Sequence, residues 1–180
     1  MISIALILFE GVEPLYQEIK DAIEAGIRYF YNDYRVEEIP LPLPPETINE
    51  KRGQVDAEKV MEFLIKDDNL KDRDIVISFL DKDMYFKGMN FIFGLAHIRE
   101  KRIVMSTYRL TRDVFLKPVD PSIYKERIFK EVLHEIGHLF QLNHCSDKSC
   151  VMSFSSSILE VDRKLPMFCK SCREKIKARM

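Results

Sequence analysis

The residues with the clearest chemical potential lie in the segment HEIGHLFQLNH, between His134 and His144. On an α-helix, His134 and His138 lie about 40° apart in projection, with Cβ atoms roughly 5–6 Å from each other, so both imidazoles can reach one metal ion. Glu135 lies beside them and can accept a proton without binding the metal itself. Because zinc lowers the pKa of a bound water toward about 7, a carboxylate placed there can activate that water. The spacing therefore predicts a hydrolytic zinc site.

Two ordinary histidines on a helix are the alternative interpretation of the HExxH pattern. The third histidine argues against it, because three of the chain's four histidines fall within this one segment. In an unbroken helix, His144 would lie about 240° around the axis from His138. It can join the site only if the helix ends and the chain turns back after Phe140. The fourth histidine, His97, is expected to be structural or at most to line the cleft.

The four cysteines form two closely spaced pairs, Cys145 with Cys150 and Cys169 with Cys172. Paired thiolates of this spacing favour a tetrahedral structural zinc. Two disulfides and an iron–sulfur cluster are the alternatives. His144 and Cys145 are adjacent, and neighbouring side chains of an extended segment point in opposite directions. A closed cysteine site would therefore hold the segment that carries His144.

The order of these residues resembles the metzincin superfamily, whose signature HExxHxxGxxH is followed by a methionine. More specifically, it is similar to the archaemetzincins, in which a cysteine follows the third histidine and a second cysteine, a methionine and a CxxC motif come after it. This chain reads HEIGHLFQLNHC, SDKS, CVM and, after sixteen further residues, CKSC. The resemblance in motif covers residues 134–172.

The resemblance implies a metzincin-like catalytic domain with two zinc ions per chain. His134, His138 and His144 would bind the catalytic zinc, and Glu135 would be the general base. Met152 would form a hydrophobic floor under the histidines. The four cysteines would bind the structural zinc.

Two positions depart from the metzincin pattern. Gln141 stands where metzincins have a glycine, and a positive φ there costs a residue with a side chain on the order of 1 kcal/mol. Asn143 tolerates the left-handed region better and could share the bend. Phe154 stands where some metzincins carry a tyrosine that helps to stabilise the transition state. Stabilisation of the oxyanion would then fall to the zinc or to another donor.

Hydrophobic periodicity predicts the elements that position these residues. Strands are expected at residues 2–8, 36–41 and 74–80, alternating with helices at residues 13–32 and 57–65. This alternation favours an α/β fold, a metzincin-like arrangement of a mostly parallel sheet flanked by helices.

Two further strands, at residues 91–98 and 102–110, are separated by a short charged connection and should form a hairpin. They complete a twisted, mixed five-stranded sheet with one antiparallel strand at its edge. By the metzincin resemblance, this edge would pair with an extended peptide, and Gly94 marks either a close approach or a bulge. The active-site helix should cover residues 122–140, with Ser122 as its N-cap.

The length of 180 residues fits a single domain. We expect an upper sheet-and-helix part at residues 1–141 and a small, irregular C-terminal subdomain at residues 142–180, which contains the four-cysteine zinc site and a short basic helix from Arg173 to Arg179. The apolar run from Ile2 to Phe9 predicts a buried strand rather than a signal peptide, because no Lys or Arg precedes it and Glu10 follows. Since no apolar run is long enough to span a membrane, we expect a cytoplasmic protein.

A formal net charge of −1 provides no electrostatic case for binding nucleic acid or an anionic membrane. We expect a zinc metallopeptidase, acting as a monomer on peptide or protein substrates. A broad protease would be harmful in the cytoplasm, which favours an aminopeptidase or a small-peptide hydrolase. The alternative is a catalytically quiet zinc protein that acts as a binding module. Glu135 argues against it, because a silent site has no chemical need of a base. A zinc module that binds nucleic acid is the third hypothesis.

Overall fold

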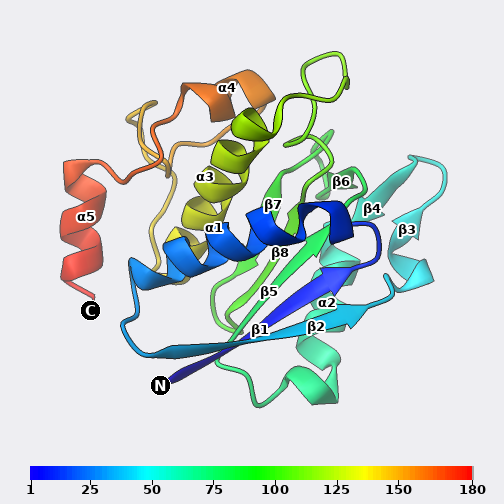
Figure 1. Cartoon of the computed structure of the whole chain (residues 1–180), viewed down its shortest axis with the longest axis horizontal. Coiled ribbons are helices and arrows are strands. Elements are labelled where there is room, and N and C mark those ends of the chain that lie inside the picture. Colours follow the sequence, from blue (N-terminus) through cyan, green and yellow to red (C-terminus); the bar gives the residue numbers. More distant parts are fainter. Residues whose placement is uncertain (180) are drawn as a thin grey trace.

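The computed structural model describes residues 1–179 and has a twisted sheet at its centre, with helices packed on it (Figure 1). The sheet has five strands in the order β2-β1-β5-β8-β7. Neighbours run parallel, except that β7 pairs antiparallel with β8 at the edge. The strands are β1 (Ile2–Phe9), β2 (Tyr34–Leu41), β5 (Ile75–Leu80), β7 (Gly94–His97) and β8 (Arg102–Ser106). The predicted mixed sheet with one antiparallel edge strand is confirmed.

The central strands are buried on both faces, which explains their continuous apolar sequences. Ile4 and Leu6 of β1 belong to the core shared with α1 and α3, whereas Ala5 and Ile7 pack in the core shared with α2. The helices that pack on the sheet are α1 (Tyr16–Arg28), α2 (Ala57–Lys66) and α3 (Pro121–Leu139). Figure 1 shows α1 and α3 on one face of the sheet and α2 on the other. The active-site helix α3 is therefore largely buried from Arg127 to Gly137, the part that carries His134 and Glu135.

Several short elements lie outside the predicted pattern. A second, three-stranded sheet consists of β3 (Ile48–Asn49), β4 (Gln54–Asp56) and β6 (Met84–Tyr85). Three 3-10 helices are also present, η1 (Glu13–Leu15), η2 (Pro45–Thr47) and η3 (Asp68–Leu70). Strands of two or three residues are too short to show an alternating pattern, so the sequence did not reveal them.

The edge hairpin is shorter than predicted. β7 covers only Gly94–His97 of the expected residues 91–98, and β8 ends at Ser106. The two residues before β7 bond to different strands: the N–H of Ile92 donates to the carbonyl of Met84 in β6, and the carbonyl of Phe93 accepts the N–H of Ser106 in β8, both at 2.9 Å. The segment is thus shared between the two sheets.

Helix α3 begins with a different cap from the one predicted. The side chain of Asp120, not Ser122, is the N-cap, and its Oδ1 accepts the N–H of Ser122 at 2.9 Å. Pro121 occupies the first helical position, where its missing N–H has no consequence. The hydroxyl of Ser122 donates to the same carboxylate at 2.8 Å. Because the carboxylate of Asp120 caps the helix and proline is favoured at the first helical position, α3 begins earlier than predicted.

Helix α3 ends in a left-handed turn at Gln141, whose φ is 58°. The N–H of Gln141 donates to the carbonyl of His138 at 2.8 Å, and the N–H of Leu142 donates to that of Gly137 at 3.1 Å. This pair of bonds is a Schellman motif. The chain therefore reverses direction directly after Phe140, and the glutamine adopts the conformation for which a glycine was expected.

The C-terminal segment contains two helices, α4 (Ile158–Arg163) and α5 (Lys170–Lys177). α4 was not predicted, because its six residues are too few to show helical periodicity. α5 begins at Cys169 as its N-cap, earlier than the expected basic helix. The division of the chain at residue 141 stays a prediction. Within residues 1–179, no helix combines the length and the apolar character needed to cross a bilayer.

Replacing Gln141 with glycine should stabilise the protein, because glycine adopts the observed positive φ without a steric cost. We expect the free energy of unfolding of Gln141→Gly to exceed that of wild type by up to about 1 kcal/mol, part of the gain being offset by the larger chain entropy of unfolded glycine. Gln141→Ala retains the steric cost and should stay close to wild type. Chemical denaturation measures both variants, and a glycine variant less stable than the alanine variant would contradict the prediction.

Candidate active site and metal centres

The reversal after α3 brings three imidazoles together. Metal-binding nitrogens of His134, His138 and His144 lie within 4.8 Å of one another. The Nε2 atoms of His134 and His138 are 3.1 Å apart, and the ring of His144 stacks over that of His134 with centroids 5.3 Å apart. Tetrahedral zinc with bonds of about 2.0–2.1 Å separates its nitrogen ligands by about 3.3 Å. The three rings therefore fit one zinc ion.

Backbone carbonyls fix the orientation of two of these rings. His134 Nδ1 lies 2.8 Å from the carbonyl oxygen of Val151, and His138 Nδ1 lies 2.8 Å from that of Leu142. A carbonyl only accepts, so each Nδ1 carries the proton and each Nε2 keeps its lone pair for a metal. Burial lowers the pKa of His134, His138 and His144, which keeps the rings in the neutral form that ligates.

Glu135 lies in the same cavity, against the backbone of the edge strand. A Cβ atom on Gly94 would lie 2.4 Å from Glu135 Oε1, which is far inside van der Waals contact. Gly94 is thus required for the close approach of this carboxylate. Of the two roles predicted for Gly94, a close approach or a bulge, the close approach is correct. Burial, reinforced by the carboxylate of Glu131 one helical turn earlier, raises the pKa of Glu135 well above its usual range.

Met152 lies directly under the helix that carries the histidines. Its side chain is fully buried, and a Cβ atom on Gly137 would lie 2.5 Å from its Sδ atom. The ring of Phe154 packs against the imidazole of His144, with centroids 5.2 Å apart. Met152 thus supports α3 from below, while Phe154 offers a hydrophobic contact and no hydroxyl.

The four cysteines form a second cluster, and all are free thiols. Their Sγ atoms lie within 4.8 Å of one another; Cys145 and Cys169 are 3.8 Å apart, as are Cys150 and Cys172. Tetrahedral zinc with bonds of about 2.3 Å separates its sulfur ligands by about 3.8 Å. The cluster therefore has the dimensions of a tetrahedral metal site.

A short backbone segment joins the two clusters. The carbonyl of Val151 accepts from His134, and the carbonyl of Met152 accepts the N–H of Cys145 at 2.9 Å. Cys150, which directly precedes Val151, contributes its thiol to the cysteine cluster. The position of the cysteines is therefore coupled to the orientation of the histidine rings through single hydrogen bonds.

A cavity of about 240 Å³ opens over the histidines. Its polar side consists of α3 and the segment after it, and its apolar side is residues 86–98, which carry Phe86, Met89, Ile92 and Phe93 into the lining. We call residues 86–98 the apolar wall. His97, although part of this segment, does not line the cavity; its Nδ1 accepts the N–H of Glu100 at 3.2 Å and so stabilises the β7–β8 turn.

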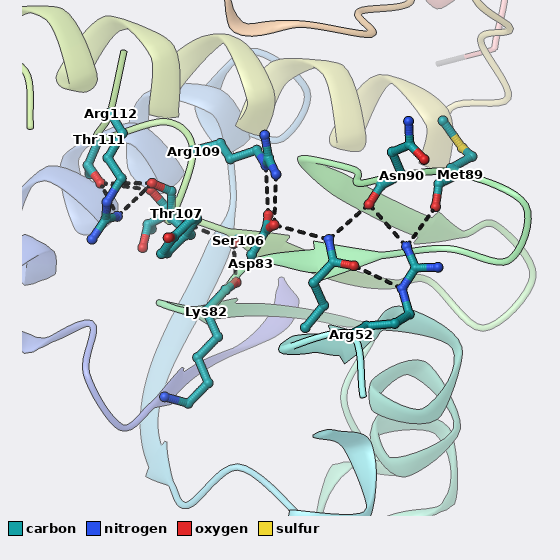
Figure 2. Close-up of polar contacts among 12 residues, drawn as sticks. Arg52, Lys82, Asp83, Met89, Asn90, Ser106, Thr107, Arg109, Thr111 and Arg112 are labelled. Carbon is teal, nitrogen blue, oxygen red and sulfur yellow. Dashed lines mark hydrogen bonds and ion pairs between the residues drawn. The ribbon is translucent and has the colours of Figure 1, made fainter. Parts of the chain in front are cut away.

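A polar network holds the apolar wall from behind (Figure 2). Arg52 donates to the carbonyls of Met89 and Asn90, both at 3.2 Å. Asp83 accepts two bonds of 2.8 Å from Arg109, whose guanidinium also lies over the ring of Phe91 at 3.7 Å. Since bidentate ion pairs fix geometry as well as contributing energy, the wall is held in a defined position.

Three polar residues of the cavity were missed in the sequence: Glu131, Ser155 and Lys164. Glu131 could have been found, because it lies four residues before Glu135 and therefore on the same helical face. Ser155 and Lys164 had no local signal. Lys164 follows α4, a helix that the sequence did not predict.

Comparison with known proteins identifies the family. The model of peptidase family M54 matches residues 1–178. The chain is also 39% identical over 172 residues to an archaemetzincin of Methanopyrus kandleri, covering 96% of this chain and 94% of the relative. A second archaemetzincin, of Aeropyrum pernix, is 45% identical over 139 residues and is covered to 73%, with 76% of this chain aligned. The chain belongs to the archaemetzincin family.

Solved archaemetzincin structures have the same fold. The crystal structure from Methanopyrus kandleri superimposes with a TM-score of 0.87 at 36% identity, covering 99% of this chain and 94% of that one. The structure from Archaeoglobus fulgidus, complexed with malonate, superimposes with a TM-score of 0.77 at 30% identity and coverages of 97% and 99%. As a member of the archaemetzincin family, the chain is a zinc metallopeptidase and acts on peptides or proteins.

Gly94→Ala should impair peptidase activity without removing metal. The added methyl would displace the carboxylate of Glu135, and a displacement of about 1 Å can cost on the order of 100-fold in rate. We therefore expect kcat/KM to fall by about 10–100-fold while the zinc content, measured by elemental analysis, stays unchanged.

Gly26→Ala is the matched control for this change. It adds the same methyl group against Val132 Cγ1 at 2.7 Å, and the next nearest atoms belong to Ile136 and Leu133 of α3, not to Glu135. It should lower the melting temperature but leave kcat/KM of the folded protein close to wild type. Unchanged kcat/KM in Gly94→Ala would contradict the importance of this close approach.

Proposed function

We propose that His134, His138 and His144 hold the catalytic zinc and that Glu135 is the general base of peptide-bond hydrolysis. The observation that carries this proposal is the convergence of three metal-binding nitrogens in one cavity with a carboxylate that is not needed as a ligand. Three protein ligands leave a coordination position open, which distinguishes catalytic from structural zinc sites.

The chain's own residues supply the remaining functions. Zinc, when bound, polarises a carbonyl and lowers the pKa of water. Glu135 accepts the proton of the attacking water and passes it to the leaving amine, a role that its raised pKa favours. The free edge of β7 can pair with the main chain of an extended peptide, which aligns the scissile bond over the histidines.

The dimensions of the cavity favour small substrates. It is about 240 Å³ in volume and is bounded by the apolar wall, which the ion pair of Arg109 with Asp83 holds in place. Short peptides, and among them substrates of an aminopeptidase, fit such a site better than a folded protein. We further propose that the enzyme acts as a monomeric single domain, without nucleic acid.

The cysteine cluster is proposed to hold the second, structural zinc. Four thiolates complete a tetrahedral shell and leave no position for a substrate. Its function is to fix the segment of Cys145 and thereby the adjacent His144. A catalytically quiet binding module would use the same two metals, but it would have no use for Glu135.

Glu135→Gln should abolish most of the activity and retain both metals. Removing a general base typically lowers the rate by 10²–10⁴-fold. We expect this loss in kcat/KM for a fluorogenic peptide that wild type cleaves, with unchanged zinc content. Glu58→Gln, the same change at an exposed position on α2, should leave activity at the wild-type level. Equal activity of wild type and Glu135→Gln would favour the binding module.

Elemental analysis should find about two zinc ions per chain. His138→Ala should lose one and Cys169→Ala the other, because each removes a ligand from a different cluster. Cys169→Ala should also lower the melting temperature more than His138→Ala, since the cysteines connect segments far apart in the sequence. Iron instead of zinc in the cysteine cluster would support the iron–sulfur alternative.

A further inference from the structure

Lys164 is a buried cation in the lining of the catalytic cavity. It directly follows α4, it is 3% exposed, and it lines the cavity together with His134 and Glu135. Lysine is almost never buried unless its charge is compensated. The mechanism proposed above makes no use of this charge, so its presence beside the reacting groups calls for an explanation.

The partners of Lys164 are incomplete. Its Nζ atom lies 4.0 Å from Glu131 Oε1, which is beyond hydrogen-bond distance. Among the described residues, Glu131 Oε1 and Ser155 Oγ are buried and have no hydrogen-bond partner at all. An ammonium group has three N–H donors. N–H donors of Lys164, a carboxylate oxygen of Glu131 and the hydroxyl of Ser155 are therefore left without hydrogen-bond partners in the lining of one cavity.

A second buried lysine shows what full compensation looks like in this protein. Lys130 of α3 is 2% exposed, and its Nζ forms an ion pair with Glu126 at 2.6 Å. It also donates to the carbonyls of Val161 and Asp162, both at 3.2 Å. Lys130 does not line the cavity. Lys130 thus has an acceptor for each of its three N–H donors, whereas Lys164 does not.

Burial acts on both members of the loose pair. It lowers the pKa of Lys164 and raises that of Glu131, so each charge is costly where it lies. An anion that enters the cavity would accept hydrogen bonds from the ammonium, and the hydroxyl of Ser155 lines the same cavity. Charge-assisted hydrogen bonds in such surroundings are about twice as strong as neutral ones.

We propose that Lys164, together with the hydroxyl of Ser155, binds a carboxylate group of the peptide substrate. The inference rests on the proposed function, because it requires the peptide to lie over the three histidines. The carboxylate can come from the C-terminus of a short peptide or from an Asp or Glu side chain next to the scissile bond. In either case, the enzyme selects peptides that carry a negative charge close to the bond that is cut.

The first test compares matched substrates with zinc-loaded, full-length protein. One peptide pair differs only in a free C-terminal carboxylate against a carboxamide, and a second pair has Glu or Gln next to the scissile bond. We expect wild type to prefer the carboxylate member of at least one pair by about 10–100-fold in kcat/KM. The pair that shows the preference identifies the source of the carboxylate. No preference in either pair would overturn the proposal.

Lys164→Met should abolish this preference by slowing the carboxylate peptide alone. Lys130→Met, which removes the saturated lysine, should lower stability but keep the preference. Glu131→Gln leaves the ammonium without its nearby negative charge and should keep or increase the preference. If Lys164 served only as the partner of Glu131, neither Lys164→Met nor Glu131→Gln would change the ratio between the two peptides. That result would overturn the proposal.

Two further measurements keep the test decisive. If Lys164→Met fails to fold, the double variant with Glu131→Gln removes both members of the loose pair, so that Glu131 is not left as a buried charge without its partner. Calorimetric titration of the zinc-loaded Glu135→Gln variant with the same peptides measures binding without turnover. The inference is supported, even if no peptide is cleaved, when this variant binds the carboxylate peptide more tightly than its uncharged match. Adding Lys164→Met should then remove the difference in affinity. Cleavage by wild type without any carboxylate preference retains the proposed function and rejects the inference.

Discussion

The left-handed turn at Gln141 is the constraint on which the site depends. Helix α3 can align only His134 and His138, since a third histidine six residues later would face away on a continuous helix. The Schellman bonds at the end of α3 reverse the chain, and His144 returns to the first two rings. The turn costs on the order of 1 kcal/mol in a residue with a side chain, which the binding of a metal ion exceeds several-fold. The free energy of metal binding would therefore be enough to keep Gln141 in the left-handed conformation that a residue with a side chain disfavours.

The two metal clusters are parts of one unit. Val151 and Met152 use consecutive carbonyls, one for the ring of His134 and one for the backbone of Cys145. A metal held by the cysteines would therefore order the segment that positions both His134 and His144. If the cysteines hold a structural zinc and the histidines a catalytic one, as proposed, this coupling places a rigid, closed site directly behind an open site whose ligands must keep their geometry during catalysis.

The other side of the cavity is built by the sheet edge. Gly94 brings the backbone of β7 against Glu135, and the network around Asp83 holds the apolar wall at a fixed distance from the histidines. Arg52 lies in the turn between β3 and β4, and Asp83 directly precedes β6, so residues next to the short strands of the second sheet anchor this network. The second sheet thus stabilises the apolar wall, which is longer than β7 alone.

Regular spacing along the chain was enough to predict the chemistry of neighbouring residues and the main secondary-structure elements. The four-residue spacing of His134 and His138, the paired cysteines and the alternation of apolar strands and helices predicted the ligand clusters and the mixed five-stranded sheet. Contacts between distant segments became visible only in the folded chain: Gly94 lies against Glu135, and Lys164 lies beside Glu131 in the cavity. Local periodicity reports which face of an element is buried, but it carries no information on which residue of another element will lie opposite. That choice belongs to the packing of the whole chain.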